Sequence, residues 1–425
     1  MKRKSRLPLR KTAAKYRRAR KSLREPISKR SRLGLDWTNF FISDVQTSFG
    51  SFVAFYLAGL NWSKPDVGLV LTIGGLAAVI SLVPGGALAD EIARKRLLVA
   101  CGIISLAGAA LIYAFVPTFQ MVVLAELLHG ITAGLIGPGI SAISLGLVGR
   151  RAMSSRTGRN QRFQAAGTAI TAGLMGFIGA TFSTRAIFFA TAGFCMPALL
   201  ALNLIQPKEI DYQRARNAKT GDKSRERSRL IDLAKNPPLL AFAACLMLLQ
   251  LADASMLPII GENLALGGGR LSSLYMSGLV VVPQLVVAAL APWAGYHSEK
   301  RGRKPLLLLA FGMEALRALL LALFSLYPIL ILVQVLNGVS GAIITVLTIL
   351  VITDLTTGSG RFNLTVGLVG MLQAIAAAIS TTLSGFLFAK FGTSIGFLGI
   401  TGVAVAATLL LWISVPETKP SNYLD

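Results

Sequence analysis

Long apolar segments separated by short polar loops fill the chain from Leu35 onward. Each segment has the length of about 20 residues that a helix needs to cross a hydrocarbon layer roughly 30 Å thick. Apolar residues run continuously in them rather than alternating, and backbone amides in lipid must be paired within a helix or a closed barrel. The pattern therefore predicts an all-α integral membrane protein with twelve transmembrane helices, over 36–60, 66–89, 97–116, 120–148, 162–182, 186–205, 238–261, 272–296, 305–325, 328–353, 363–389 and 394–415.

Composition agrees with this pattern and argues against other classes of protein. Of the 425 residues, 53% are hydrophobic and 15% are charged, against about 25% charged in a typical soluble domain. The chain contains no nucleophile elbow, no P-loop and no dinucleotide-binding fingerprint. Its three cysteines lack metal-ligand spacing. We therefore expect no enzyme, no cofactor and no metal site.

The distribution of Lys and Arg predicts an orientation in the membrane. Residues 1–34 carry 15 basic residues and one acid, Glu25, within a net charge of +24. With this arm in the cytoplasm, cytoplasmic segments hold 38 Lys and Arg and outer loops hold four. This predicts a multi-pass protein of the bacterial inner membrane with both termini cytoplasmic. The arm should rest on anionic lipid headgroups, and nucleic acid is not expected as a partner.

The two halves of the chain repeat one another. A long polar segment, 206–236, separates a half over 35–205 from a half over 237–416, which a short tail, 417–425, follows. Polar residues recur at an offset of 208 or 209 residues, since Asp44 matches Asp253 and Glu126 matches Gln334. Such a long-period repeat predicts two six-helix units of the same orientation.

The loops after the second segment of each half carry a glycine, a carboxylate four residues later and then basic residues. They resemble the signature Gly-x-x-x-Asp-(Arg/Lys)-x-Gly-Arg-(Lys/Arg) of the major facilitator superfamily, with Glu299 for aspartate in the second copy and Ala93 for glycine in the first. The resemblance covers residues 36 to about 416 and implies two pseudo-symmetric six-helix bundles that alternate between inward and outward openings. It implies a cytoplasmic gate at Gly86, Asp90, Arg94, Gly295, Glu299, Gly302 and Arg303.

The gate expectation has a physical basis. Asp90 ends one helix on the side where the segment 363–389 begins, and a carboxylate facing a helix N-terminus gains about 0.3–1 kcal/mol. Gly86, one turn earlier, permits a close helix approach. By the repeat, Gly295 and Glu299 should face the start of the segment 162–182. The alternative is that the basic residues only follow the positive-inside rule.

Ionisable residues inside the membrane point to the transport cavity. In the superfamily the first and fourth helices of each half line a central cavity, and the polar residues fall on these helices. Arg317 can be satisfied by Glu314 on its own helix, so the acids of the cavity lack a fixed cation. The predicted cavity residues are Asp44, Glu126, His129, Gln250, Asp253, Gln334 and Asn337, with Asp44 and Glu126 as preferred proton carriers.

These observations favour a monomeric secondary active transporter that moves a small molecule. Excess acid in the cavity suggests proton-coupled export of a cationic or neutral solute. The acids could instead pair with one another or with backbone groups and carry no proton. A proton-symporting uptake permease is the first functional alternative. A transporter-derived sensor or scaffold that works through its basic arm is the second.

Overall fold

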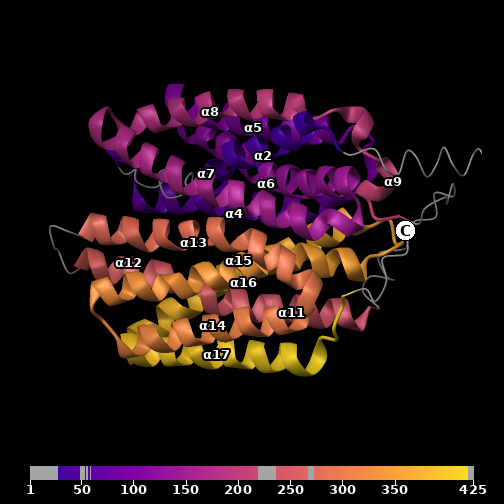
Figure 1. The fold of residues 1–425 in the computed structure, drawn as a ribbon. Helices are drawn as coiled ribbons and strands as arrows, with labels where there is room; N and C mark the ends of the chain where they lie inside the picture. Colours follow the sequence, from indigo (N-terminus) through magenta and orange to yellow (C-terminus); the bar gives the residue numbers. More distant parts are fainter. Residues whose placement is uncertain are drawn as a thin grey trace, which may run out of the picture.

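Two six-helix halves lie against each other along their length (Figure 1). The computed structural model describes residues 27–47, 53, 56–57, 59–218, 236–266 and 272–419. The N-half consists of α2 (Lys29–Thr47), α4 (Lys64–Glu91), α5 (Lys95–Phe115), α6 (Phe119–Val148), α7 (Met153–Thr181) and α8 (Thr184–Leu204).

The C-half repeats this arrangement after two short helices in the central segment. Those two are η2 (Pro207–Glu209) and α9 (Tyr212–Ala215), while η1 (Arg150–Ala152) precedes α7. The C-half consists of α11 (Pro237–Asp253), α12 (Met256–Leu266), α13 (Ser272–Arg301), α14 (Lys304–Leu323), α15 (Tyr327–Leu355), α16 (Phe362–Phe391) and α17 (Thr393–Ser414). We call the end of the bundle where α9 lies the α9 end (Figure 1).

The prediction of an all-α membrane fold is confirmed. Within the described residues, ten helices are long and apolar enough to cross a membrane. The predicted segment 36–60 corresponds to α2 and to helical residues up to Gly59. The predicted segment 162–182 corresponds to α7, which begins nine residues earlier because its first turns are polar yet helical. The predicted segment 238–261 is broken into α11 and α12 by a turn at Ala254 and Ser255.

Helix starts follow ordinary capping rules. Ser63 accepts a hydrogen bond from the backbone N–H of Asp66 at 3.2 Å, and Asn236 accepts one from Leu239 at 3.3 Å. Prolines occupy the first turns of α4, α11, α14 and α15, where no intrahelical donor is needed. These signals divide the apolar sequence into separate helices.

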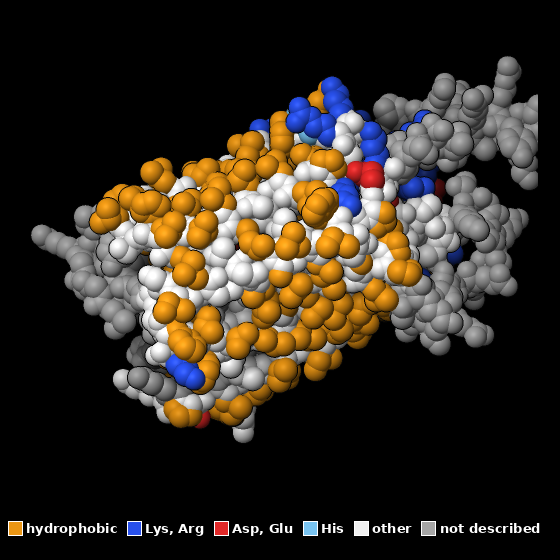
Figure 2. Space-filling view, turned by 90° about the horizontal axis from the view of Figure 1, so that it is seen from below, with side chains coloured by type: hydrophobic (Ala, Val, Ile, Leu, Met, Phe, Trp, Pro, Cys, Tyr) orange, Lys and Arg blue, Asp and Glu red, His pale blue; other side chains and the backbone are white. Residues whose placement is uncertain are grey.

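The surface has an apolar belt between charged ends. Figure 2 shows hydrophobic side chains spread over one long face, with Lys and Arg gathered mainly toward one end. Large apolar side chains such as Trp412 and Ile413 are 61% and 80% exposed. An apolar belt of this extent is expected for a surface that faces lipid.

The halves meet through two matching helix pairs, α4 with α16 and α7 with α13. Glycines allow these backbones to touch. A Cβ on Gly158 would lie 2.6 Å from the carbonyl oxygen of Ala291, and one on Gly367 would clash with the carbonyl of Leu82. These contacts lie within the turns nearest the α9 end, so the bundle is closed there.

The boundaries of the expected segments change in two places. The first helix begins at Lys29, so the last residues of the arm 1–34 belong to α2, while residues 1–26 lie outside the described residues. The central segment 206–236 is folded onto the bundle as far as Ala218, and residues 219–235 lie outside the described residues.

Candidate functional site

Asp90 joins the two halves at the α9 end. Its carboxylate is fully buried and accepts hydrogen bonds from the backbone N–H groups of Asn363 and Leu364, at 3.1 and 2.8 Å. The Asn363 side chain donates a third bond at 2.8 Å. These backbone groups belong to the first turn of α16, which has no intrahelical partner for them. A carboxylate at the end of α4 therefore caps a helix of the other half, in the position that the sequence indicated.

Gly86 makes this contact sterically possible. A Cβ at this position would lie under 3.0 Å from the carbonyl oxygen of Asn363 and 3.0 Å from the Cα of Leu364. Because both obstructing groups are backbone, no rotamer change could relieve the clash. The glycine lets α4 approach α16 closely enough for the carboxylate one turn later to reach its donors.

The corresponding loop of the C-half repeats this contact only in part. Gly295 lies against the carbonyl of Ser154 at the start of α7, as the repeat predicted. Glu299, however, does not repeat the capping of Asp90, since its Oε1 is buried and has no hydrogen-bond partner among the described residues. The two joints between the halves therefore differ: a buried carboxylate caps a helix at one, whereas the other has close packing and a hydrogen bond of 3.1 Å from Arg162 Nε to the carbonyl of Ala288.

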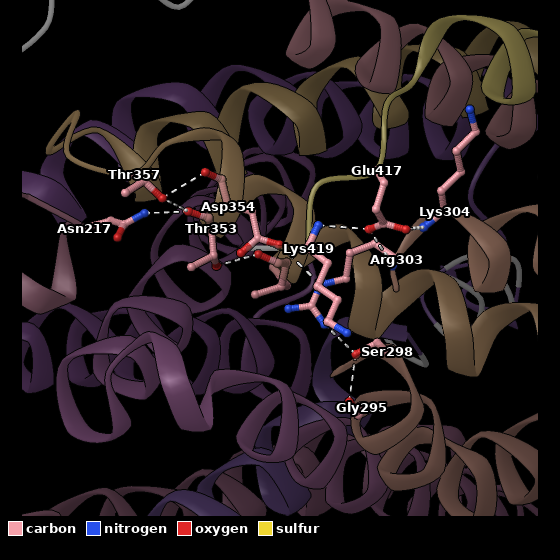
Figure 3. A network of polar contacts seen from close by, with 11 residues as sticks. Asn217, Gly295, Ser298, Arg303, Lys304, Thr353, Asp354, Thr357, Glu417 and Lys419 are labelled. Atoms are coloured by element: carbon pink, nitrogen blue, oxygen red, sulfur yellow. Dashed lines mark hydrogen bonds and ion pairs between the residues drawn. The ribbon is translucent and has the colours of Figure 1, made fainter. Parts of the chain in front are cut away.

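Arg303 is instead the centre of a network within the C-half (Figure 3). It is 2% exposed, its Nε lies 3.2 Å from a carboxylate oxygen of Asp354, and its Nη1 donates to Ser298 at 2.8 Å. Glu417 accepts from the backbone N–H groups of Arg303 and Lys304, at 2.8 and 3.1 Å, and so caps α14. Gly302 adopts a positive φ of 96°, and a Cβ at this position would lie under 3.0 Å from the Glu417 carboxylate.

Arg94 is not placed as a gate residue, because its side chain is exposed. The buried cation of this loop is its neighbour Lys95, which is 1% exposed and donates to the carbonyl of Ala89. The Lys95 ammonium also lies 5.0 Å from the centre of the Tyr212 ring. Since α5 begins at Lys95, Arg94 sits outside the helix and points away from the packed interior.

Residues 211–218, which we call the α9 strap, tie the loops of the two halves together. Asn217 donates from its side chain to the carbonyl of Thr353 at 2.7 Å, and its own carbonyl accepts from the backbone N–H of Gly358 at 2.8 Å. Both partners lie at the end of α15 or just beyond it. Asn217 is buried and has a φ of 59°, a left-handed conformation that asparagine tolerates better than most residues.

The other end of the α9 strap holds the N-half. The backbone N–H of Asp211 donates to the carbonyl of Gly146 at 3.1 Å, and the Tyr212 hydroxyl donates to the carbonyl of Glu91 at 3.2 Å. The carbonyl of Ala215 accepts from the side chain of Asn363 at 2.8 Å. The strap thus reinforces the contact between Asp90 and α16, and sequence reasoning, which treated it as a linker, missed it.

A cavity of about 220 Å³ lies beneath this closure, between the two halves. Its polar side chains all come from α2, α6 and α7, whereas the C-half contributes two aliphatic side chains from α15 and α16. None of the described side chains that line it is ionisable. The lining consists of Asn39, Ile42, Ser43, Ile136, Gly137, Ile140, Ser141, Ser144, Met153, Thr157, Asn160, Gln161, Gln164, Ile349 and Val366.

Six of the seven cavity residues expected from the sequence do not line this cavity, and the side chain of the seventh, Asp44, lies outside the described residues. Glu126 is 3% exposed and its carboxylate accepts a hydrogen bond of 2.6 Å from the Tyr113 hydroxyl. Its other oxygen occupies the space that a side chain at Gly74 would fill. Glu126 therefore points between α4, α5 and α6 inside the N-half, because the glycine on α4 leaves room for it there.

Asp253 has a fixed cation, contrary to the expectation from the sequence. Its carboxylate lies 2.5 Å from a guanidinium nitrogen of Arg317, which is fully buried and also pairs with Glu314. Arg317 on α14 is therefore not satisfied by Glu314 alone. We call these three residues the C-half ion cluster; it carries two carboxylates and one guanidinium, next to the turn that separates α11 from α12.

The remaining expected residues are dispersed. Gln334 is fully buried, with an amide nitrogen that has no hydrogen-bond partner among the described residues, and Asn337 donates to its oxygen at 3.4 Å. Gln250 and His129 are half-buried on α11 and α6. Asp44 lies in α2, but its side chain falls outside the described residues.

A second ion cluster was not expected from the sequence. Asp36 on α2 is fully buried and pairs with Arg156 and Arg159 of α7, the latter at 2.5 Å. The spacing of the two arginines by three residues, which places them on one face of a helix, was the available signal. It was missed because these residues were assigned to a loop.

Comparison with known proteins identifies the family. The family model described as Major Facilitator Superfamily matches residues 35–283 and 254–424. An uncharacterized MFS-type transporter of Mycobacterium tuberculosis (strain H37Rv) is 32% identical over 391 residues, which covers 91% of this chain and 94% of that protein. The quinolone resistance protein NorA of Staphylococcus aureus is 26% identical over 159 residues, which is 36% of this chain and 40% of NorA.

The fold comparison agrees. The proton:xylose symporter XylE, solved with 6-bromo-6-deoxy-D-glucose, superposes with a TM-score of 0.70 at 16% identity, covering 92% of this chain and 96% of XylE. At that identity the likeness concerns the fold alone. Together with the family model and the mycobacterial relative, it shows that this chain belongs to the Major Facilitator Superfamily.

Proposed function

We propose that this protein is a secondary transporter that carries a small molecule across the membrane by alternating access of the cavity between its halves. The observation that carries the proposal is the joint between Asp90 and the start of α16 directly above that cavity. Three hydrogen bonds to one buried carboxylate stabilise the closed α9 end. Rocking the halves apart would break all three together and open the cavity at this end.

The α9 end is assigned to the cytoplasm of a bacterial inner membrane. Its support is the excess of Lys and Arg in the segments that meet there. Single cysteines at Arg94 near the α9 end and at Asp66 near the other end, introduced into a chain without its native cysteines, should react with a membrane-impermeant maleimide from opposite sides. Reaction from the same side would contradict the assignment.

Proton coupling is assigned to the C-half ion cluster. Asp253 and Glu314 share one guanidinium, so the cluster has one uncompensated negative charge; Glu314 and Arg317 are buried, and the Asp253 side chain is 37% exposed. Binding one proton removes that charge, and the cluster adjoins the turn at Ala254 and Ser255, where α11 and α12 can change their relative angle. This assignment replaces Asp44 and Glu126 as the preferred proton carriers.

Export is the favoured direction, in exchange for protons. The similarity to proteins named for quinolone resistance supports removal of a solute from the cell. Inverted membrane vesicles from cells with and without the gene test the direction. An outward proton gradient, from an acidic lumen, should drive solute into inverted vesicles, whereas an uptake symporter would accumulate solute only in right-side-out vesicles with an inward gradient.

The transporter proposal is tested against a sensor or scaffold by reconstitution. Purified protein in proteoliposomes should catalyse solute flux, and the Gly86→Leu variant, which cannot close at the α9 end, should lose it. A chain lacking residues 1–26 should retain flux, because the arm contributes lipid contacts rather than the pathway. Full cellular function without flux, lost only on removal of the arm, would favour the scaffold.

A further inference from the structure

One face of α7 presents a polar stripe to the cavity. Thr157, Asn160, Gln161 and Gln164 are spaced by three, one and three residues, so they lie on a single side of the helix. All four line the cavity. A polar stripe in a membrane helix is costly unless it faces a polar partner. The stripe faces the cavity, so those of its groups that have no partner in the protein can gain one from there.

One hydroxyl of the stripe has no hydrogen-bond partner in the described part of the closed protein. Thr157 is 3% exposed and its hydroxyl has no hydrogen-bond partner among the described residues. A buried hydroxyl without a partner is destabilising, because it has lost its hydrogen bonds to water and gained none in the protein. Thr157 is also one of the residues that line the cavity, so a ligand that reaches its enclosed hydroxyl from there would supply the missing partner.

Asn160 is held in a fixed orientation behind the same wall. Its oxygen accepts a hydrogen bond of 2.7 Å from Arg156, and its amide nitrogen donates to the hydroxyl of Ser144 at 2.8 Å. The amide nitrogen has a second N–H, and the two hydrogen bonds of the amide group fix the direction in which this N–H points. The charge of Arg156 is engaged by Asp36 behind the wall and is not presented to the cavity.

The opposite wall is apolar. The C-half contributes Ile349 and Val366, which offer no hydrogen bonds. A ligand in this cavity would therefore bond on one side and make van der Waals contact on the other. An ion would find no opposite charge among the described lining residues and would lose its hydration, which is strongly unfavourable.

We infer that the cavity binds a small uncharged solute rich in hydroxyl or amide groups, held by the α7 stripe and packed on Ile349 and Val366. The inference rests on the proposed transport function and narrows its substrate class. The cavity volume of about 220 Å³ lies below the usual range of about 300–1,000 Å³ for ligand pockets, which favours a compact solute. Cationic cargo, which an acid-lined cavity would have favoured, has no carboxylate among the described lining residues.

The test is thermal stabilisation of the purified full-length protein in detergent. The uncharged probes are erythritol, D-mannitol, D-glucose and N-methylacetamide. The charged probes are tetraphenylphosphonium, a cation, and benzoate, an anion. We expect a saturable rise in melting temperature from at least one uncharged probe and none from the charged probes, because only a bound ligand stabilises in proportion to its occupancy.

Two matched variants locate the effect. Thr157→Val keeps the shape of the side chain and removes the orphaned hydroxyl; it should raise the Kd of the stabilising probe by about three- to tenfold, the effect of one lost hydrogen bond. Thr171→Val makes the same change about four turns further on, where the hydroxyl bonds to the carbonyl of Gly167 and does not line the cavity. It should leave the Kd unchanged. Melting temperatures without probe show that both variants are folded.

Three results would overturn the inference. The first is a saturable rise in melting temperature from a charged probe that Thr157→Val weakens. The second is a rise from an uncharged probe that Thr157→Val leaves unaltered. The third is no rise from any uncharged probe. Flux of the same probes in proteoliposomes separates this from the transport proposal. Flux of a charged probe contradicts only the substrate class, whereas binding of an uncharged probe without flux of any probe contradicts the transport function and leaves the site in place.

Discussion

Asp90 accepts a hydrogen bond of 2.8 Å from the backbone N–H of Leu364, a residue 274 positions later in the chain. This bond ties the two halves together through a carboxylate that is fully buried. Hydrogen bonds to charged groups contribute about 1.5–3 kcal/mol each. One carboxylate with three donors can therefore determine whether the α9 end is open or closed.

Asp90→Asn should shift the protein toward the state open at the α9 end. The amide can accept through only one oxygen, and its N–H₂ group would face the backbone N–H donors of α16. A loss of about 1.5–3 kcal/mol reduces the closed population relative to the open one by about 10- to 150-fold. Distances between spin labels at Arg94 and Lys300, both exposed and on opposite halves, would lengthen.

Asp66→Asn provides the control for this prediction. It makes the same chemical change at the other end of α4, where the carboxylate is exposed and bonds to Ser63. The label distances should stay as in the parent protein. Equal distances in the Asp90→Asn and parent proteins would show that the capping bond does not hold the closure.

Gly86→Ala should block closure through sterics alone. The added Cβ would meet the backbone of Asn363 and Leu364, which cannot move aside without separating α4 from α16. Gly75→Ala on the same helix has nothing within 4 Å of the added atom and serves as the control. We expect only Gly86→Ala to keep the Arg94–Lys300 label distance long and to stop solute flux while expression stays normal. Unchanged flux in Gly86→Ala would contradict the close approach.

The contact of Asp90 could be predicted because a repeated motif supplied it. Gly86 and Asp90 occur one turn apart at a helix end, and the partner helix begins on the same side of the membrane, so chain order alone brings them together. Glu299 matched the motif equally well, yet it does not form the equivalent bonds. A motif fixes where a residue lies along its helix but not whether its bonds are made.

The polar residues inside the helices could not be placed in the same way. Which side of a helix faces the cavity depends on packing, and a single small residue on a neighbouring helix can decide it. Gly74 leaves the space into which Glu126 turns, and Asp253 meets Arg317, 64 residues away, at a helix contact that no local spacing reveals. The polar stripe of α7 was not predicted, because the arginines of this helix made its first turns resemble a loop.

Asn217→Ala should weaken the α9 strap. The substitution removes the hydrogen bond to the carbonyl of Thr353, worth about 0.5–1.5 kcal/mol, and places alanine in a left-handed conformation that costs about 1–2 kcal/mol. Asn217→Gly removes the same bond but tolerates the backbone. Both should lengthen the Arg94–Lys300 label distance, and alanine should do so more. A longer label distance in the glycine variant than in the alanine variant, or an unchanged distance in both, would show that the strap does not stabilise the closed state.

Asp253→Asn should uncouple transport from the proton gradient, whereas Glu126→Gln should not. With Asp253 neutral, Glu314 and Arg317 form a balanced pair, and the charge that a proton would relieve is gone. A pH difference of one unit is worth about 1.4 kcal/mol, or about a tenfold solute ratio for one proton exchanged. The Asp253→Asn variant should lose this ratio in proteoliposomes and still exchange solute down its own gradient.

Glu126→Gln keeps the hydrogen bond from Tyr113 through its carbonyl oxygen, and the side chain lies away from the cavity. It should therefore retain both the solute ratio and its dependence on pH. Arg317→Met extends the test to stability, because it leaves two carboxylates without their cation and should lower the free energy of unfolding by about 3–5 kcal/mol. Adding Asp253→Asn and Glu314→Gln to Arg317→Met should restore most of that loss. If Glu126→Gln abolishes the proton-driven ratio while Asp253→Asn preserves it, the proton is carried in the N-half, and the C-half ion cluster serves only to hold α11 against α14.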